Sequence, residues 1–286
     1  MAASSIKTSS IVQKFPKYRS ILVGNQYYFP SILVDYLVVG AGGIGMGNPA
    51  YGGGSGAGGG TVKTGSLFTL PIGSTFTVTV APTNSTSSTN GASSVFSTVT
   101  ALGGGYGLNG TPGISANGIS GGNGGGAYVA GSVTGTYTGG AGVDGYPGAT
   151  VSNNGNMYGY VGGGGGGAGG AGSGKNAGPG VASSITGTTV YYGGGGNGTD
   201  FGGAGTTGNG ATAASTAGAA NTGAGGGRGN GSAPYSYNGG SGIVVIAYPN
   251  TYPALSSIPG TLTYDQPTRT GYRVYRFTAG TGTVTV

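Results

Sequence analysis

Hydrophobic residues along this chain gather into short runs that are bounded by glycine. The run Tyr36–Val39 is apolar or aromatic throughout and opens directly into Gly40-Ala41-Gly42-Gly43. Ile243–Tyr248 is a second run of the same kind, at the far end of the glycine-rich region. Because both runs are short, consecutive and rich in β-branched and aromatic residues, they predict buried β-strands rather than helices.

Other segments alternate polar and apolar residues. Thr75–Val80 alternates at period two and predicts a half-buried strand, and a further strand is predicted over Ser94–Leu102. Near the C-terminus, Tyr272–Phe277 and Thr281–Val286 alternate cleanly and predict a hairpin that turns at Ala279–Gly280. No segment has a convincing helical period, so the expected class is all-β, with the strands arranged as a sandwich.

Glycine dominates residues 103–242. Runs such as Gly162–Gly167 break the every-third-residue rule of collagen. Ordering glycine costs more backbone entropy than ordering any other residue, so a repetitive structure has to offset that cost. Polyproline-II-type glycine helices packed side by side would do so, because backbones without Cβ atoms approach closely enough to hydrogen-bond. The β-like interruptions Ala127–Ala130 and Thr188–Tyr192 predict that the chain returns to the sandwich there.

The residue types missing from the chain exclude most enzyme chemistry. There is no Cys, His, Trp or Glu, which removes thiolate and imidazole catalysis and the usual zinc ligands. Gly40–Gly45 matches the dinucleotide-binding pattern G-x-G-x-x-G, but Pro49 and Gly52-Gly53-Gly54 are incompatible with the helix that this motif needs. We therefore expect a protein that is not an enzyme and that has no cofactor and no metal.

The net charge of +6 lies at the two ends of the chain, and the glycine-rich middle is nearly neutral. A nucleic-acid binder needs a basic stripe with interleaved aromatics on one surface, so we expect docking or solubility as the role of these ends, and no nucleic acid. No apolar run reaches the roughly 20 residues that span a bilayer, and Met1–Tyr18 lacks the apolar core of a signal peptide.

The chain divides into three predicted regions: an attachment arm over 1–34, a glycine-rich sandwich and helix body over 35–249, and a C-terminal segment over 250–286. Aromatic and basic residues of the arm and of the C-terminal segment are candidate docking residues: Phe15, Lys17, Tyr18, Arg19, Tyr272, Arg273, Tyr275, Arg276 and Phe277. Tyrosines that punctuate the glycine region are candidate receptor contacts, because exposed aromatic rings bind by stacking: Tyr106, Tyr137, Tyr146, Tyr158, Tyr160, Tyr235 and Tyr237.

The order of four blocks resembles the glycine-rich domain of bacteriophage tail-fibre and adhesin proteins. These blocks are Tyr36–Gly43, Gly65–Val80, Thr100–Gly105 and Gly242–Pro249. The N-terminal segment Lys14–Asn25 is similar to the start of virion structural proteins in tailed phages of aquatic bacteria. A more distant likeness is to the glycine-rich domain of animal receptor kinases, which accompanies a tumour-necrosis-factor-like sandwich.

The resemblance implies a jelly-roll or tumour-necrosis-factor-like sandwich and a non-enzymatic virion surface protein that attaches to a host. Such a protein is made in the host cytoplasm without a signal peptide and is located in the virion. Its implied partners are other virion or fibre proteins, held through the arm, and a host surface glycan or outer-membrane protein. It is also implied to assemble with copies of itself, as a trimer or a head-to-tail filament, without membrane insertion.

One departure from the family leaves an alternative open. A strand like Tyr272–Val284 commonly precedes the Leu-Val-Val-Gly strand in relatives, but here it lies at the C-terminus. It therefore completes either the sandwich of its own chain or that of the next subunit, which would build a filament by strand addition. The alternative function is a purely structural fibre or appendage subunit. An ice-binding role would need a regularly spaced Thr/Ala face, which the sequence lacks.

Overall fold

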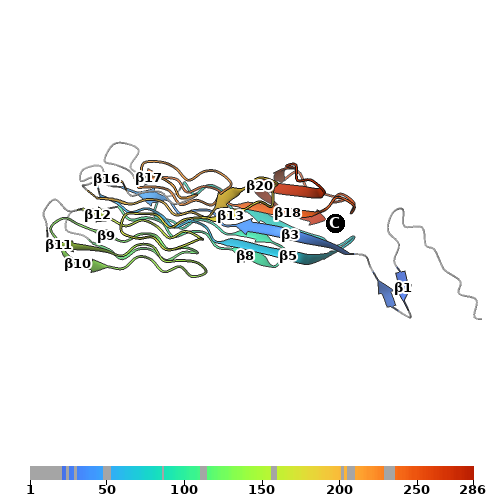
Figure 1. The fold of residues 1–286 in the computed structure, drawn as a ribbon, viewed down its shortest axis with the longest axis horizontal. Helices are drawn as coiled ribbons and strands as arrows, with labels where there is room; N and C mark the ends of the chain where they lie inside the picture. The colour runs from blue at the N-terminus through green and yellow to red at the C-terminus, as the bar shows by residue number, and fades with distance from the viewer. Residues whose placement is uncertain are drawn as a thin grey trace, which may run out of the picture.

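The hydrophobic runs meet in one β-sheet at one end of the molecule, and the glycine-rich segments extend from this sheet as a long body (Figure 1). The computed structural model describes residues 21–23, 26–28, 31–47, 53–85, 87–109, 115–155, 160–200, 203–204, 210–228 and 236–286. These ranges contain strands, turns and extended segments but no helix, which confirms the all-β prediction for the part of the chain that is described.

Eight strands form the sheet, which we call the framework. They are β3 (Ser31–Val39), β5 (Val62–Pro71), β6 (Thr75–Val80), β7 (Ser94–Phe96), β8 (Val99–Ala101), β18 (Ile243–Pro249), β19 (Leu262–Asp265) and β20 (Tyr272–Thr285). Their order is β5-β3-β18-β20-β6-β7-β8, and β19 pairs with β20 outside this path. Every pairing is antiparallel. The sheet nearly closes on itself, because Thr61, just before β5, donates its backbone N–H to Leu102, just after β8, at 2.9 Å.

The inner face of the framework holds the main hydrophobic core. The two runs that the sequence marks as buried strands lie side by side, with Val38 opposite Val244, and both side chains are fully buried. Aromatic rings fill the space between the two ends of the sheet, where Phe68 of β5 and Phe96 of β7 have centroids 5.1 Å apart. The ring contact closes the core where the two edges make no ladder. These residues confirm the predicted strands.

The alternating segment Thr75–Val80 also forms its predicted strand, with Phe76, Val78 and Val80 pointing into the core. The strand predicted over Ser94–Leu102 is wrong as a single element. The chain turns at Ser97 and Thr98, and β7 pairs with β8. Ser97 has a φ of 52°, a left-handed conformation that a tight turn requires and that a continuous strand does not allow.

The predicted C-terminal hairpin is likewise wrong in its pairing. Tyr272–Thr285 is one continuous strand, β20, whose first half pairs with β18 and whose second half pairs with β6. The chain bends where the hairpin was expected, because Gly280 has a φ of 95° and a Cβ there would lie 1.9 Å from the Thr261 carbonyl oxygen. β20 therefore joins the two parts of the sheet within its own chain, and 250–286 is integral to the framework.

A hairpin from the glycine region covers the outer face of the framework. It consists of β13 (Val181–Ser183) and β14 (Val190–Tyr192). Tyr192 is buried in a second cluster with Leu37, Val245 and Val274, residues that point away from the main core. Both faces of β3 and β18 are consequently buried here, which explains why their sequences are apolar at consecutive positions instead of alternating.

The glycine body is built around the buried segment 53–61. Its successive N–H groups donate to three neighbouring segments in turn, and the cycle repeats at every third residue. The acceptors for residues 55–61 are Leu108, Gly163, Gly226, Gly105, Gly166, Gly223 and Leu102. Its carbonyl groups accept from three further segments, through Gly43, Gly126 and Gly196 among others. The central segment thus has six hydrogen-bonded neighbours, and its contacts are made by backbone atoms rather than apolar side chains.

Short strand pairs decorate the body, mostly away from the framework (Figure 1). They are β4 (Gly45–Met46) with β17 (Ser236–Tyr237), β9 (Tyr128–Val129) with β12 (Val161–Gly162), β10 (Thr134–Tyr137) with β11 (Val151–Asn154), and β15 (Thr199–Asp200) with β16 (Gly203–Ala204). We call the end of the glycine body that carries these strand pairs, opposite the framework, the distal end. The interruption Ala127–Ala130 therefore pairs within the body, contrary to prediction, whereas Thr188–Tyr192 does return to the framework as β14.

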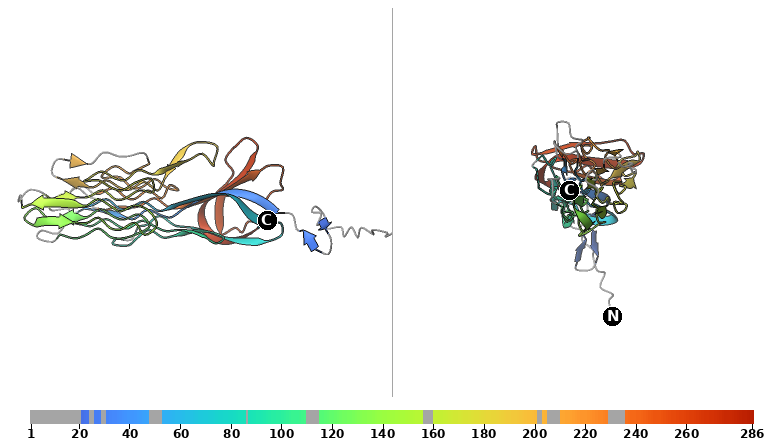
Figure 2. Two further views of the ribbon diagram at one scale, coloured as in Figure 1. Left: turned by 60° about the horizontal axis from the view of Figure 1, so that its bottom comes forward. Right: turned by 90° about the vertical axis from the view of Figure 1, so that its left-hand side faces the viewer.

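The described residues of the N-terminal region form a small hairpin, β1 (Ile21–Val23) with β2 (Gln26–Tyr28), which pairs with none of the other described strands. Figure 2 shows it beyond the framework, on the side opposite the distal end. The predicted arm of 1–34 is too long at its C-terminal boundary, because β3 begins at Ser31 and the side chains of Ile32 and Val34 belong to the core. Residues 1–20 lie outside the described part of the chain.

Candidate functional site

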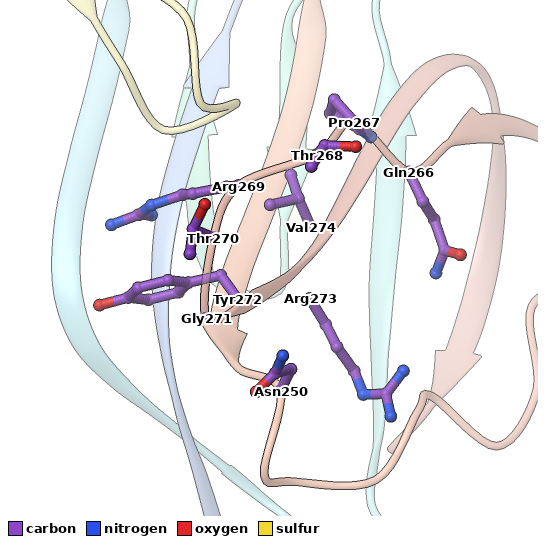
Figure 3. A pocket seen from close by; sticks show the side chains of 10 residues that line it. All are labelled: Asn250, Gln266, Pro267, Thr268, Arg269, Thr270, Gly271, Tyr272, Arg273 and Val274. Atoms are coloured by element: carbon purple, nitrogen blue, oxygen red, sulfur yellow. The ribbon is translucent and has the colours of Figure 1, made fainter.

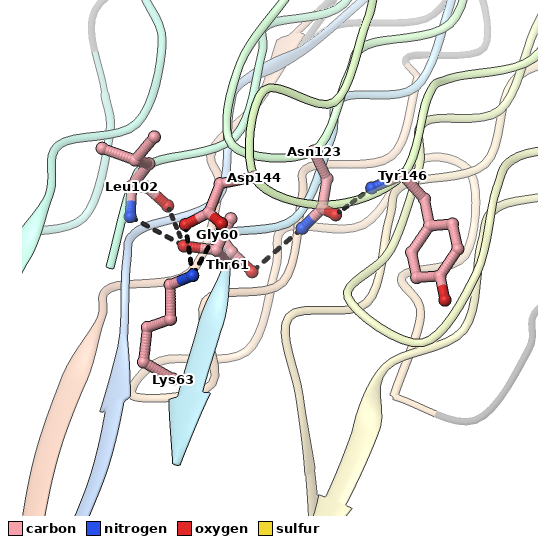
Figure 4. A network of polar contacts seen from close by, with 7 residues as sticks. All are labelled: Gly60, Thr61, Lys63, Leu102, Asn123, Asp144 and Tyr146. Atoms are coloured by element: carbon pink, nitrogen blue, oxygen red, sulfur yellow. Dashed lines mark hydrogen bonds and ion pairs between the residues drawn. The ribbon is translucent and has the colours of Figure 1, made fainter. Parts of the chain in front are cut away.

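The junction between framework and body holds a buried polar network around Asn123, whose side chain is fully buried (Figure 4). Its Nδ2 group donates to the carbonyl oxygens of Gly59 and Gly60, at 2.9 and 3.1 Å. Its Oδ1 atom accepts the backbone N–H of Tyr146 at 2.9 Å. The amide therefore satisfies donors and acceptors of two segments at once, and it fixes the loop that carries Tyr146 against the central segment.

An exposed ion pair continues this network toward solvent. Lys63 Nζ lies 2.6 Å from Asp144 Oδ1 and 2.5 Å from Oδ2, so the first part of β5 is tied to the same loop as Tyr146. Thr61 lies between these contacts and donates its hydroxyl to the Leu102 carbonyl oxygen at 3.3 Å. The polar groups of the network bond to one another, which indicates a structural joint rather than a reactive centre.

Replacing Asn123 by alanine should lower the free energy of unfolding by about 2 kcal/mol, because buried donors and acceptors are left without partners. Asn90 provides a matched control. Its side-chain amide donates one hydrogen bond, to Ser120, and accepts one, from Tyr106, but the side chain is exposed, so water replaces the lost partners. Asn90→Ala should therefore cost less than about 1 kcal/mol. Chemical denaturation of both variants tests this difference, and equal losses would contradict the role assigned to the Asn123 network.

The distal end contains a second cluster, formed by Tyr128, Tyr160, Thr199 and Arg228. Tyr128 and Arg228 are almost completely buried, and the guanidinium donates to the Thr199 hydroxyl. Gly53 permits the close approach of both tyrosines, because a Cβ there would lie 2.7 Å from the Tyr128 ring and 3.0 Å from Tyr160 Cβ. The cluster therefore ties four segments of the body together near its distal end.

Burial governs the protonation of this cluster. Desolvation raises the pKa of the Tyr128 phenol well above its ordinary value, and it lowers the pKa of the Arg228 guanidinium to about 10. At neutral pH the phenol is therefore neutral and the guanidinium is charged. Neither group has the shifted pKa near 7 that general acid–base catalysis favours, so the cluster offers hydrogen bonds and one fixed charge.

The candidate receptor-contact tyrosines do not converge on one surface. Tyr160 lies directly before β12 and Tyr237 lies in β17, and both are half-buried, as is Tyr137 in β10. Tyr146 is 45% exposed, but it lies at the junction with the framework, beside Asn123. Tyr106 lies midway along the body, where its N–H donates to Asn90. The remaining two candidates, Tyr158 and Tyr235, lie outside the described residues.

The candidate docking residues of the C-terminal segment are part of their own chain's framework. Tyr275 and Phe277 are buried in the main core, so these two side chains are not available as a docking surface. Arg276 forms an ion pair with Asp265, and this hydrogen bond raises the pKa of the Arg276 guanidinium. Tyr272 and Arg273 are half-buried and border a cavity. The arm residues Phe15, Lys17, Tyr18 and Arg19 lie outside the described residues.

That cavity has a volume of about 470 Å³ and is lined by Asn250 and residues 266–274 (Figure 3). The Arg269 guanidinium lies 3.7 Å from the Tyr272 ring centroid and 3.6 Å from the Asp35 carboxylate, so its charge is already engaged. Arg273 points to the other side and donates from Nε to the Tyr252 carbonyl oxygen at 3.0 Å. The sequence analysis selected Tyr272 and Arg273 as candidates but not Arg269. Arg269 could have been selected because it belongs to the same cluster of C-terminal arginines as Arg273 and Arg276.

The described ranges were compared with the requirements of a metal site and of a membrane-spanning helix. No three Asp side chains come together there to ligate a metal, and no helix is present to span a membrane. The pattern Gly40–Gly45 is followed by strand β4 and not by a helix, and the N–H groups of Gly40, Ala41, Gly42 and Gly43 donate to other segments of the body. Those groups are thus engaged within the protein and do not form a phosphate cradle.

Comparisons with known proteins identify the chain at the level of a family. No curated protein matches the chain, and no solved structure does. A family model described as a glycine-rich domain matches residues 23–249, which include β2, the whole glycine body and the framework as far as β18. The matched region leaves out β19 and β20, although both belong to the same sheet. Because the model covers most of its length, the chain belongs to the glycine-rich domain family.

Proposed function

We propose that this protein is a non-enzymatic attachment protein of a virion surface, of the tail-fibre or adhesin type. In this proposal the N-terminal arm holds other virion proteins and the distal end of the glycine body contacts a host surface glycan or outer-membrane protein. The observation that carries the proposal is the central segment 53–61, which is hydrogen-bonded to six neighbours and supports the distal end at a distance from the N-terminal hairpin. Binding residues commonly lie on loops positioned by such a rigid scaffold.

We further interpret the segments of the body as polyglycine-II-type helices. Such a helix has three residues per turn and no internal hydrogen bonds. The three-residue cycle of partners along 55–61 has this period, and every bond in the cycle leads to another segment. Segment 163–166 repeats the pattern, with Gly163 and Gly166 donating to Ala127 and Gly124. A hydrogen-bonded array of this kind is stiff, which suits a protein that holds a binding surface away from its anchor.

The framework is interpreted as a sandwich of the jelly-roll or tumour-necrosis-factor-like type. In support, β20 passes from the part of the sheet that contains β3 and β18 to the part that contains β6 and β7. The side chains of both parts meet in one core, for example through Tyr36 and Phe96, whose ring centroids are 5.6 Å apart. The framework would then serve as the rigid base of the body and as the connection to the arm.

The proposal predicts that binding depends on distal tyrosines. A Tyr160→Ala/Tyr237→Ala double variant should bind host cells about 5- to 150-fold more weakly, because aromatic stacking contacts are worth about 0.5–1.5 kcal/mol each. The measurement is the binding of fluorescently labelled protein to a panel of intact aquatic bacteria and to arrayed surface glycans. The matched control is Tyr191→Ala, because Tyr191 is 37% exposed but belongs to β14 on the framework.

Three results would count against this function. The intact protein would bind none of the cells or glycans, the control variant would lose as much binding as the distal variant, or antibodies against the protein would fail to label virions. A distal variant that binds normally, with cells still recognised, would move the contact to another part of the body. Circular dichroism of both variants confirms that lost binding does not reflect lost folding.

A further inference from the structure

Beyond its start, where Thr61 is hydrogen-bonded to Leu102 next to β8, strand β5 leaves one long edge of the framework without a paired strand. It pairs with β3 along one side only, over register positions from Val62 opposite Val39 to Pro71 opposite Ser31. Within the described residues, the N–H groups of Val62–Leu70 donate no hydrogen bond outside this ladder. The other end of the sheet, β8, is only three residues long. An unpaired strand of this length is a template for another strand, and natural proteins seldom leave one uncovered.

The middle of this edge carries a strained and exposed leucine. The ladder shifts register between Val34 and Tyr36, and the extra residues bulge on β5. Leu67, in that bulge, has a φ of 59° and is 69% exposed. Leu33, on the neighbouring strand opposite Thr69, is a second exposed leucine at 40%. A left-handed conformation favours Gly or Asn, and a largely exposed leucine there buries little surface in its own chain. Such backbone outliers concentrate at functional contacts.

The N-terminal hairpin β1–β2 has the composition of strands that need a neighbouring sheet. Its strand residues are Ile21, Leu22, Val23, Gln26, Tyr27 and Tyr28, of which only Gln26 is fully polar. The hairpin is two-stranded and pairs with no other strand in the described part of the chain. An isolated hairpin is marginally stable in water, and three or more strands or a covering surface are needed to stabilise it. An apolar hairpin of this size therefore needs a sheet to extend.

We propose that the β5 edge binds the β1–β2 hairpin of a second copy of this chain, with Leu33 and Leu67 covered by the contact. Only two residues separate Tyr28 from Ser31, so the chain spans about 10 Å between them when fully extended. A strand on the free edge of β5 would lie about 9.5 Å from β3, because β5 stands between them. The connection from Tyr28 to Ser31 would use its full length to cover this distance and could not also pass around the end of β5. Pairing with the edge of its own chain is thus disfavoured by geometry, and each copy offers both a hairpin and an edge.

The absence of cysteine from the chain permits a direct test. Two single variants of the full chain, Leu22→Cys and Thr69→Cys, are purified separately, and the second carries an affinity tag that changes its mass. After mixing, a short bis-maleimide should produce a cross-linked species with one copy of each. The matched control replaces Thr69→Cys by Thr281→Cys, because Thr281 is also an exposed threonine of the framework but lies on β20. This control should yield much less product.

The role of Leu67 is tested with Leu67→Asn in the Thr69→Cys chain. Asparagine tolerates the left-handed conformation, so the thermal midpoint should not fall, while cross-linking should decrease at least tenfold. The proposal is overturned if light scattering finds a monomer at every concentration and no mixed product forms. It is equally overturned if a Leu22→Cys/Thr69→Cys double variant cross-links only within one chain. These outcomes do not depend on host binding, so failure of this assembly surface and failure of the attachment function are distinguishable.

Discussion

Replacing Gly56 by alanine is expected to cost on the order of 4 kcal/mol of folding free energy. Gly56 lies in the central segment of the glycine body, where its N–H donates to Gly163 and its carbonyl oxygen accepts from Gly126. A Cβ at this position would lie 1.8 Å from the Gly196 carbonyl oxygen and 2.8 Å from the Asn197 carbonyl carbon. These are backbone atoms of a neighbouring segment that is itself bonded on several sides, so the clash cannot be relieved by a side-chain rotation.

Thermal unfolding measures this effect, which should lower the midpoint by on the order of 10 °C for a chain of this size. Gly260→Ala is the matched control. It makes the same substitution on an exposed framework loop, where a Cβ meets nothing within 4 Å. Its midpoint should stay unchanged or rise slightly, because alanine restricts the unfolded chain. If both variants melt at the same temperature, close backbone packing does not hold the body together.

Replacing Phe277 by alanine should destabilise the framework by about 3–5 kcal/mol, the usual cost of truncating a buried aromatic side chain. Phe277 is fully buried and lies opposite Val244 in the ladder between β20 and β18. Its ring also packs against Tyr264 and Tyr275, with centroid distances of 5.8 and 6.5 Å. The cavity would open where β20 passes from one part of the sheet to the other, so both parts lose packing.

Urea denaturation of Phe277→Ala and of Thr281→Ala separates burial from position on the strand. Thr281 belongs to the same strand but is exposed, and its substitution should change stability by less than about 0.5 kcal/mol. A small loss for Phe277→Ala, comparable to that of Thr281→Ala, would mean that β20 is not part of the core of its own chain in solution. That result would favour the alternative in which this strand pairs with the sheet of a neighbouring subunit.

The strands of the framework were largely predictable, because the polarity of each side chain along a strand indicates whether that side of the strand is buried. The apolar run that contains Val38 and the one that contains Val244 have the composition of strands buried on both faces, and the structure places them side by side. The path of β20 was not predictable. Alternation specifies which face of a strand is buried, but the choice between a hairpin and a single bent strand depends on which partners the chain meets, here β6 and β18.

The glycine body was predictable only in kind. Glycine has no side chain whose pattern could reveal a neighbour, so the three-residue cycle of partners along 55–61 leaves no trace in the sequence. The role of Asn123 was missed for a related reason, since its partners Gly59 and Gly60 are more than sixty residues away. Leu67 carries no local signal either, because its left-handed conformation arises from a mismatch in register with β3.

A core of backbone groups also determines how the body responds to temperature. The apolar surface exposed on unfolding raises the heat capacity of the unfolded chain, whereas exposed peptide groups lower it. The segment 53–61 and its six neighbours bury mainly peptide groups, so their unfolding adds little to this difference. The free energy of unfolding of the body should therefore vary with temperature with less curvature than that of a hydrophobic core of equal size. Cooling, which weakens hydrophobic packing, should therefore not weaken the body as it weakens a hydrophobic core.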